Sequence, residues 1–294
     1  MSRVAVVGLG NMGGPMAANL VAAGHTVTGY DPVPAAREAA AAAGVTMHPD
    51  GAAAVADADV VVTMLPTGGH VLAVYDELLP AAPAGALFVD CSTIDVASAR
   101  TAHDRAAAAG HPSVDAPVSG GVVGAEAATL TFMAGGDPAA VDAAGPLLAA
   151  LGKRTVHCGG PGAGQVAKVC NNMVLGASMI AVAEAFVLAE RLGLEPQALH
   201  DVMATSSGQC WAVSTNCPVP GPVPTSPANR DFAGGFAAQL MLKDLRLADA
   251  AAADAGVELA LGRRAAERYA EFTARDPRVQ DFSAIITDIR EARS

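Results

Sequence analysis

A lysine and two asparagines lie close together in an otherwise apolar stretch of the chain. Lys168, Asn171 and Asn172 are spaced i, i+3 and i+4, so on a helix they can share one face. Apolar surroundings lower the pKa of an ammonium group, which would suit Lys168 to exchanging a proton with a substrate hydroxyl. The alternative is a lysine whose stem covers apolar surface while its charge reaches water. Motifs elsewhere in the chain are needed to distinguish a catalytic lysine from a surface lysine.

A glycine-rich turn near the N-terminus has the spacing of a dinucleotide-binding site. The motif is Gly8-Leu-Gly10-Asn11-Met12-Gly13, and it follows the apolar run 3–7 and opens a predicted helix over 12–23. Glycines permit the tight turn and let backbone N–H groups approach a pyrophosphate at the helix N-terminus. The strand before the motif and the helix after it are the context that such a site requires.

Asp31 ends the second predicted strand, over 25–30, and indicates which dinucleotide is bound. A carboxylate at this position accepts hydrogen bonds from the adenosine ribose and repels a 2′-phosphate. We therefore expect NAD rather than NADP. Arg37, six residues further on, is a cation that could weaken this preference.

Small polar residues and glycines follow three other predicted strands. Leu65, Pro66 and Thr93 come at or just after the strands 59–65 and 86–90, where ligands bind in sheets of this kind. The run Asp115-Ala-Pro-Val-Ser119-Gly120-Gly121 follows a further strand, and its hydroxyl and successive N–H groups could hold a carboxylate. Ordinary turns and a plain loop are the alternatives.

The order of predicted elements indicates two domains. Strands over 3–7, 25–30, 59–65 and 86–90 alternate with helices, and later strands are expected near 114–118, 130–133 and 155–157. This pattern predicts an α/β Rossmann domain with a doubly wound, mostly parallel sheet over 1–162. Residues 163–294 read as an all-helical domain, and its first helix, from about 165 to 192, would join the two.

Composition excludes several functions. The net charge is −11 without any basic block, which argues against nucleic acid and anionic membranes as partners. Apolar stretches look too short or too interrupted to span a bilayer, and the N-terminus lacks the pattern of a signal peptide. Five cysteines without a Cys-x-x-Cys pair indicate free thiols and a cytoplasmic location. The histidines and cysteines show no metal-ligand spacing, so we expect no metal.

Taken together, these motifs resemble the β-hydroxyacid dehydrogenases. The glycine fingerprint, Asp115-Ala-Pro-Val-Ser119-Gly120-Gly121, the run from Gly162 to Asn172 and Leu240-Met-Leu-Lys243-Asp244-Leu occur in this family's order. The resemblance extends from end to end, and it is strongest to the 3-hydroxyisobutyrate branch. Trp211, the run 226–229, Gly235-Phe236 and Lys243-Asp244 carry that distinction from the tartronate semialdehyde and phosphogluconate branches.

The resemblance implies a role for each matched residue. Lys168 would be the catalytic lysine, and Asn172 would be the neighbour that orients the substrate. Ser119, Gly120 and Gly121 would bind the substrate carboxylate, and Trp211 would also contact the substrate. Cofactor contacts are implied for the glycine motif with Asn11 and Met12 and for Asp31, Leu65, Pro66, Thr93, Phe236 and Lys243.

The implied reaction is NAD-dependent oxidation of (S)-3-hydroxyisobutyrate to methylmalonate semialdehyde, a step of valine breakdown. Neutral Lys168 would accept the hydroxyl proton, with Lys243 as a second cation that favours the neutral form. Homodimers or homotetramers are implied as well. Three alternatives remain: a reductase for another short β-hydroxy acid, an imine reductase, and a non-catalytic NAD-binding module. Lys168 counts against the last two.

Overall fold

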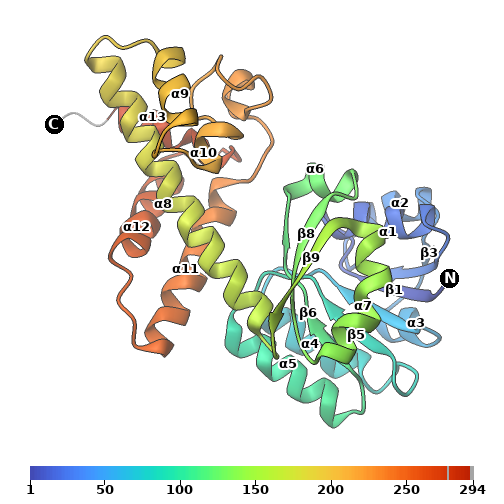
Figure 1. Cartoon of the computed structure of the whole chain (residues 1–294). Helices are drawn as coiled ribbons and strands as arrows, with labels where there is room; N and C mark the ends of the chain where they lie inside the picture. Colours follow the sequence, from blue (N-terminus) through green and yellow to red (C-terminus); the bar gives the residue numbers. More distant parts are fainter. Residues whose placement is uncertain (277, 292–294) are drawn as a thin grey trace. The chain divides into compact units, whose positions relative to one another are not determined.

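The computed structural model describes residues 1–276 and 278–291 of the chain (Figure 1). It consists of two compact units, Met1–Lys168 and Val169–Ser294. The units divide inside the long helix α8 (Ala163–Arg191), whereas the sequence places the domain boundary where this helix begins.

The first unit contains one nine-stranded sheet. Its parallel part has the order β3-β2-β1-β4-β5-β6, which is the strand order of a dinucleotide-binding Rossmann sheet. Strand β8 then runs antiparallel to β6 and β7, and β9 pairs parallel with β8. The bounds are β1 (Arg3–Val7), β2 (Thr26–Tyr30), β3 (Thr46–Met47), β4 (Val60–Thr63), β5 (Leu87–Asp90), β6 (Ser113–Asp115), β7 (Val118–Ser119), β8 (Leu130–Gly135) and β9 (Gly152–Gly159).

Helices cover both faces of this sheet, because alternate strand residues point to opposite sides. In β1, Val4 and Val6 join a core with residues of α1 (Gly13–Ala22) and α7 (Pro138–Leu151). Ala5 and Val7 belong to a second core with residues of α3, α4 and α5. The remaining bounds are α2 (Pro34–Ala42), α3 (Gly51–Val55), α4 (Gly68–Leu78), α5 (Val96–Ala108) and α6 (Gly121–Glu126). The predicted doubly wound sheet is confirmed.

The second unit is built from helices around a separate core. Its elements are α9 (Pro196–Thr205), α10 (Trp211–Ser214), α11 (Ala238–Ala255), α12 (Ala260–Arg275), α13 (Ile285–Glu291) and the 3-10 helices η1 (Pro227–Arg230) and η2 (Phe282–Ala284). Phe186, Met241, Tyr269 and Phe282 are fully buried in it. Within the described part of this unit, the only strand-like pairing is an isolated bridge between Ala237 and Asp281. The predicted all-helical domain is therefore confirmed.

Helix α8 contains a longer apolar stretch than expected from the sequence. Its 29 residues include an 18-residue window with mean hydropathy 1.8, which is long and apolar enough to cross a membrane by length and composition. The expectation that no apolar stretch reaches this length was wrong, because α8 continues without a break through Asn171 and Asn172. Since 44% of that window is buried inside the protein, and core helices meet the same test, the length is weak evidence for a membrane span.

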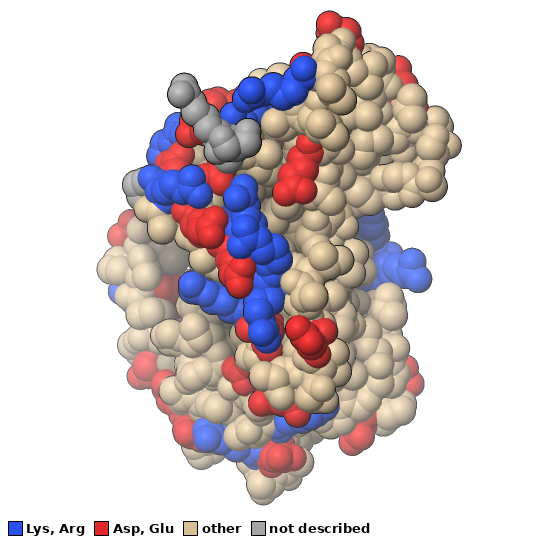
Figure 2. Space-filling model, turned by 90° about the vertical axis from the view of Figure 1, so that its left-hand side faces the viewer, with Lys and Arg blue, Asp and Glu red and all other residues tan. Residues whose placement is uncertain are grey.

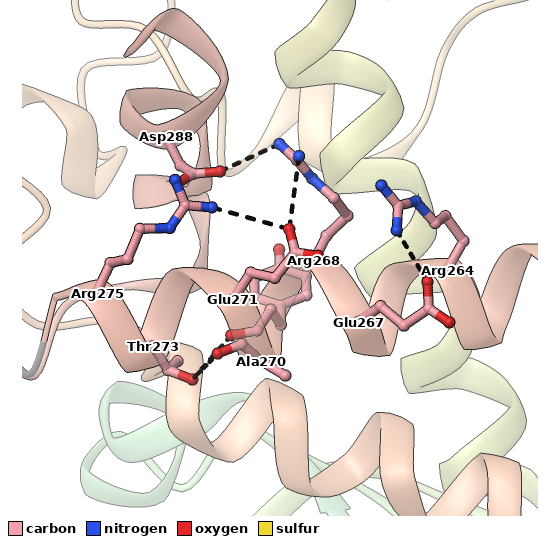
Figure 3. Close-up of polar contacts among 9 residues, drawn as sticks. Arg264, Glu267, Arg268, Ala270, Glu271, Thr273, Arg275 and Asp288 are labelled. Atoms are coloured by element: carbon pink, nitrogen blue, oxygen red, sulfur yellow. Dashed lines mark hydrogen bonds and ion pairs between the residues drawn. The ribbon is translucent and has the colours of Figure 1, made fainter. Parts of the chain in front are cut away.

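The C-terminal helices carry both signs of charge side by side. Figure 2 shows Lys and Arg next to Asp and Glu on one face, with wide areas of other residues between them. On α12, Arg264 pairs with Glu267, and Arg268 and Arg275 both pair with Asp288 of α13 (Figure 3). These basic residues of α12 are thus balanced by acidic neighbours.

Candidate active site

The glycine turn between β1 and α1 is shaped by close backbone packing at two of its three glycines. Gly8 has φ +94°, and a Cβ there would lie 2.3 Å from the Met64 carbonyl oxygen. A Cβ on Gly13 would lie 1.9 Å from the Gly8 carbonyl oxygen, whereas a Cβ on Gly10 would meet nothing within 4 Å. Gly8 and Gly13 are thus required by the fold itself, and Gly10 leaves open space where a ligand could approach.

The start of α1 is suited to an anion. Helices α3, α4 and α5 are capped by the side chains of Asp50, Thr67 and Asp95, but no side chain caps α1. The first N–H groups of α1, like those of α2, α6 and α7, have no side-chain acceptor, and at the glycine turn they are available to a pyrophosphate. In the motif, Asn11 is exposed and Met12 packs against the core beneath the turn.

Asp31 directly follows β2 and binds the glycine turn. The residue is 7% exposed, and its carboxylate accepts hydrogen bonds from the Leu9 N–H at 2.7 Å and the Val33 N–H at 2.8 Å, one on each oxygen. Since each carboxylate oxygen can accept a second bond, a ribose can still be held. Arg37 donates to the Asp31 carbonyl oxygen at 2.8 Å, so its guanidinium lies at the same turn.

The ends of β4 and β5 are tied together by Ser92. The Leu65 N–H donates to Ser92 Oγ at 2.8 Å, and Ser92 Oγ donates to Asp90 Oδ1 at 2.5 Å. Burial raises the pKa of the Asp90 carboxyl to about 6, although bonds from Ser92 and Thr63 oppose the shift. The structure thus brings the segments that contain Leu65, Pro66 and Thr93 side by side, as the strand order predicts. Leu65 and Thr93 are half-buried and Pro66 is exposed.

Lys168 is buried beside the predicted carboxylate site. Its side chain is 6% exposed in total, and Nζ donates to the Val118 carbonyl oxygen at 2.8 Å. A lysine whose charge reaches water is therefore excluded. Ser119 is half-buried next to this carbonyl, and Gly120 and Gly121 follow with φ of +138° and +62°. This backbone conformation favours glycine, and successive N–H groups in such a segment can serve an anion.

In the second unit, Asn172 is held by an acidic partner that the sequence reasoning had not assigned a role. Asn172 is 2% exposed, and its Nδ2 donates to Asp244 Oδ2 at 2.5 Å. Asn171 is exposed and donates to Asn172 Oδ1 at 2.9 Å. Lys243 Nζ lies 3.9 Å from Asp244 Oδ1. Partial burial lowers the pKa of the Lys243 ammonium, while Asp244 opposes the shift.

Trp211 and Phe236 are grouped around one buried ring. Trp211 is 49% exposed and stacks on Phe282 with centroids 6.4 Å apart, and Phe236 meets Phe282 edge-on at 5.9 Å. The Phe236 N–H donates to Asp281 Oδ2 at 2.7 Å. Asp281 and Phe282 therefore position two predicted ligand contacts. The sequence reasoning missed both, because no motif surrounds them.

No metal site is found among the described residues. Within 1–276 and 278–291, no three His, Cys, Asp or Glu side chains are grouped so that they could hold an ion.

Comparison with family models assigns both halves of the chain. Residues 3–160 match the NAD binding domain of 6-phosphogluconate dehydrogenase, and residues 162–289 match the NAD-binding domain of NADP-dependent 3-hydroxyisobutyrate dehydrogenase. The prediction of a nicotinamide dinucleotide as the cofactor is confirmed.

Comparison with curated proteins and solved structures agrees. A probable 3-hydroxyisobutyrate dehydrogenase of Mycobacterium tuberculosis is 56% identical over 99% of this chain and 98% of its own. An NAD-dependent L-serine dehydrogenase of Pseudomonas aeruginosa is 44% identical over 97% of each chain. The solved structure of Mycobacterium tuberculosis 3-hydroxyisobutyrate dehydrogenase with L-serine superposes with a TM-score of 0.96 and covers 99% of both chains.

Proposed function

Because the chain belongs to the 3-hydroxyisobutyrate dehydrogenase family, we propose that it oxidises (S)-3-hydroxyisobutyrate to methylmalonate semialdehyde with NAD, as a step of valine breakdown. One observation carries the proposal. The buried Lys168 ammonium is bonded to the Val118 carbonyl, directly beside the Ser119 hydroxyl and the two positive-φ glycines. A proton-transfer group and a carboxylate-binding segment are thus next to each other in one unit.

The roles follow from what each group can donate or accept. Backbone N–H groups of Gly120 and Gly121 and the Ser119 hydroxyl hold the substrate carboxylate. Neutral Lys168 accepts the proton of the substrate hydroxyl and, as ammonium, returns it in the reverse direction. Asn172 orients the substrate hydroxyl, and Asp244 fixes the amide of Asn172 by the bond at 2.5 Å. Trp211 contributes an exposed ring to substrate binding.

Cofactor binding is proposed for the glycine turn with Asn11, Met12 and Asp31, for Leu65, Pro66 and Thr93, and for Phe236 and Lys243. NAD held by these residues would supply the acceptor for the hydride of the carbon that carries the substrate hydroxyl. The uncapped start of α1 and the remaining acceptor sites of the Asp31 carboxylate support this assignment. They also support a preference for NAD over NADP, which the ratio of kcat/KM with the two cofactors would measure.

Replacement of Lys168 tests the catalytic assignment. Lys168→Ala should lower kcat by about 10²- to 10⁴-fold, the usual contribution of a general acid or base, while NAD affinity stays near wild type. Lys153→Ala removes an exposed lysine of β9 and serves as the matched control, with kcat expected to be unchanged. Turnover of Lys168→Ala at the wild-type rate would refute the role of Lys168.

A second candidate substrate is L-serine, which is also a short β-hydroxy acid. The relative that is 44% identical is named for this activity, and a solved relative was described with L-serine. The two substrates differ at the carbon between carboxylate and hydroxymethyl group, which carries a methyl in one and an ammonium in the other. Initial rates with each substrate at matched concentrations well below KM, read as NADH formation, would rank them by kcat/KM.

We further propose a cytoplasmic homodimer or homotetramer. The five cysteines, all without a disulfide in the structure, support a reducing compartment. Exposed apolar side chains on the helices of the second unit, such as Leu188, Val202 and Leu261, support self-association. Light scattering coupled to size-exclusion chromatography would give the mass, and a monomer would refute the oligomer.

A further inference from the structure

Gln165, three residues before Lys168 on α8, has a fully buried side chain. A buried primary amide is costly unless its donors and acceptor are bonded, so the partners of this side chain define what it does. Gln165 has no role in the function proposed above, and it belongs to the same compact unit as Lys168 and the ends of β4 and β5.

Both ends of the Gln165 amide bind one short backbone segment. Nε2 donates to the Ser92 carbonyl oxygen at 2.8 Å, and Oε1 accepts from the Ile94 N–H at 3.1 Å. These two residues flank Thr93, so one side chain holds the backbone on either side of it. Ser92 and Ile94 are almost completely buried, whereas Thr93 is half-buried. The Gln165 amide therefore fixes both the position and the orientation of the backbone segment that carries Thr93.

The start of the helix that carries Gln165 is itself fixed. Asp115 Oδ1 accepts from the Gly162 N–H at 2.8 Å, and Oδ2 accepts from the Gln165 N–H at 3.0 Å. One turn further on, Lys168 Nζ is bonded to the Val118 carbonyl oxygen. Gln165 thus lies in a turn of helix that Asp115 anchors, and the proton-transfer lysine follows it by three residues.

From these contacts we infer that Gln165 is a positioning residue, which sets the distance between the Thr93 segment and Lys168. The inference rests on the proposed function, in which Thr93 contacts the cofactor and Lys168 takes the substrate proton. Hydride and proton then leave neighbouring atoms of one substrate molecule, so the two elements must stay in register. Displacing a reacting group by about 1 Å can cost about a hundredfold in rate.

Two substitutions of Gln165 distinguish the effect of its hydrogen bonds from the effect of its side-chain packing. Gln165→Met keeps the length of the side chain and removes both hydrogen bonds. Gln165→Glu keeps the shape, and burial should hold its carboxyl protonated, so that it donates to Ser92 and accepts from Ile94 as the amide does. Gln280→Met is the control, because Gln280 is a 7% exposed glutamine of the second unit.

We expect Gln165→Met to lower kcat by about 10- to 100-fold with a change of less than about threefold in KM for NAD. The deuterium isotope effect with substrate labelled at the carbon bearing the hydroxyl should rise, since hydride transfer becomes more rate-limiting. Gln165→Glu should retain most of kcat, and Gln280→Met should match wild type. Wild-type kcat in Gln165→Met, or equal losses in the Met and Glu variants, would overturn the inference.

Hydrogen exchange provides a readout that does not depend on turnover. In wild type the Ile94 amide should exchange slowly, and in Gln165→Met protection should be lost in the peptide around residues 92–95 while that of 163–168 persists. Unchanged protection of the Ile94 amide in Gln165→Met would refute the inference that the Gln165 side chain holds this segment. If wild type failed to oxidise either proposed substrate, the proposed function would be wrong, and the exchange result would still decide whether Gln165 holds this segment.

Discussion

A buried aspartate organises the candidate site residues in each unit, Asp115 in the first and Asp281 in the second. Both are at most 2% exposed, and both accept backbone N–H groups on two oxygens. Asp115 holds the start of α8, and Asp281 holds the backbone of Phe236 and Ser283 together with the Asn216 side chain. A buried carboxylate that accepts backbone N–H groups thus organises the backbone in both the α/β unit and the helical unit.

The two aspartates differ in what surrounds them. Asp115 ends a buried strand inside a sheet, where close backbone packing defines its place, and it also contacts His103 at 2.9 Å. Asp281 lies in an irregular segment between α12 and α13, and its position depends on the loops that it binds. The sheet therefore determines the position of Asp115, whereas the hydrogen bonds of Asp281 themselves hold the surrounding loops in place.

The largest expected loss of stability comes from disturbing the backbone packing next to Asp115. A Cβ on Gly164 would lie 2.2 Å from the Met133 carbonyl oxygen and 2.7 Å from that of Asp115. Because both obstacles are backbone, Gly164→Ala should lower the free energy of unfolding by at least about 4 kcal/mol, beyond ordinary overpacking. Urea unfolding followed by circular dichroism measures this loss.

Gly160→Ala is the control for that substitution. Gly160 lies four residues earlier, and a Cβ there would meet nothing within 4 Å. Its stability should stay within about 0.5 kcal/mol of wild type, as for most surface changes. Equal losses in the two variants would show that the glycine run matters for its flexibility and not for close packing.

The second effect in size is the loss of Asp281. Asp281→Ala leaves three buried donors without an acceptor and should cost about 3 kcal/mol, whereas Asp281→Asn keeps part of the acceptor capacity and should cost less. Trp211 is the only tryptophan and stacks on Phe282, so its fluorescence reports this region directly. If the Asn and Ala variants were equally unstable, the hydrogen bonds would not be what holds the loops.

The same contrast explains what could be predicted from the sequence. The glycine turn, the strand ends and the helix with Lys168 are encoded locally, so the sequence located them. The partners of the key side chains are not local: Val118 lies 50 residues from Lys168, and Ser92 lies 73 from Gln165. The two-residue strand β3 and the four-residue helix α10 were missed because such short elements carry no periodicity.

Asp90 offers a third, smaller effect, which depends on pH. Since burial raises its folded-state pKa from 3.8 to about 6, its contribution to stability is full below about pH 4 and is lost as the pH rises through 6. The loss is of the order of 2–3 kcal/mol, from the size of the shift. Asp90→Asn keeps an acceptor for Thr63 and Ser92, so its stability should be flatter than that of wild type between pH 4 and 7.

Asp59 tests the sign of this effect. Its pKa is lowered by the hydrogen bond from Arg3, so its contribution is present above about pH 4 and is lost as the pH falls. Asp59→Asn should therefore be less stable than wild type at higher pH, whereas Asp90→Asn should be more stable than wild type there. Chemical unfolding at a series of pH values would reveal both, and a parallel dependence in the two variants would contradict the assignment of Asp90.

The smallest effects are expected among the ion pairs of the second unit. Asp288 is 6% exposed and is bonded to Arg275 at 2.7 Å and to Arg268 at 3.1 Å, which joins α13 to α12 (Figure 3). Asp288→Asn should cost about 1–2 kcal/mol, because the buried end of Arg268 loses its charged partner while Arg275 can turn to solvent.

Glu267→Gln in the exposed pair with Arg264 should cost less than about 0.5 kcal/mol and should lose even that in 1 M salt. The arginines of both pairs lie on α12, but Asp288 is buried and joins α12 to α13, whereas Glu267 is exposed and pairs within α12. A cost for Glu267→Gln equal to that for Asp288→Asn would mean that charge alone stabilises α12. The expected difference would instead show that, as with Asp281, a carboxylate stabilises this unit when it joins segments distant in sequence.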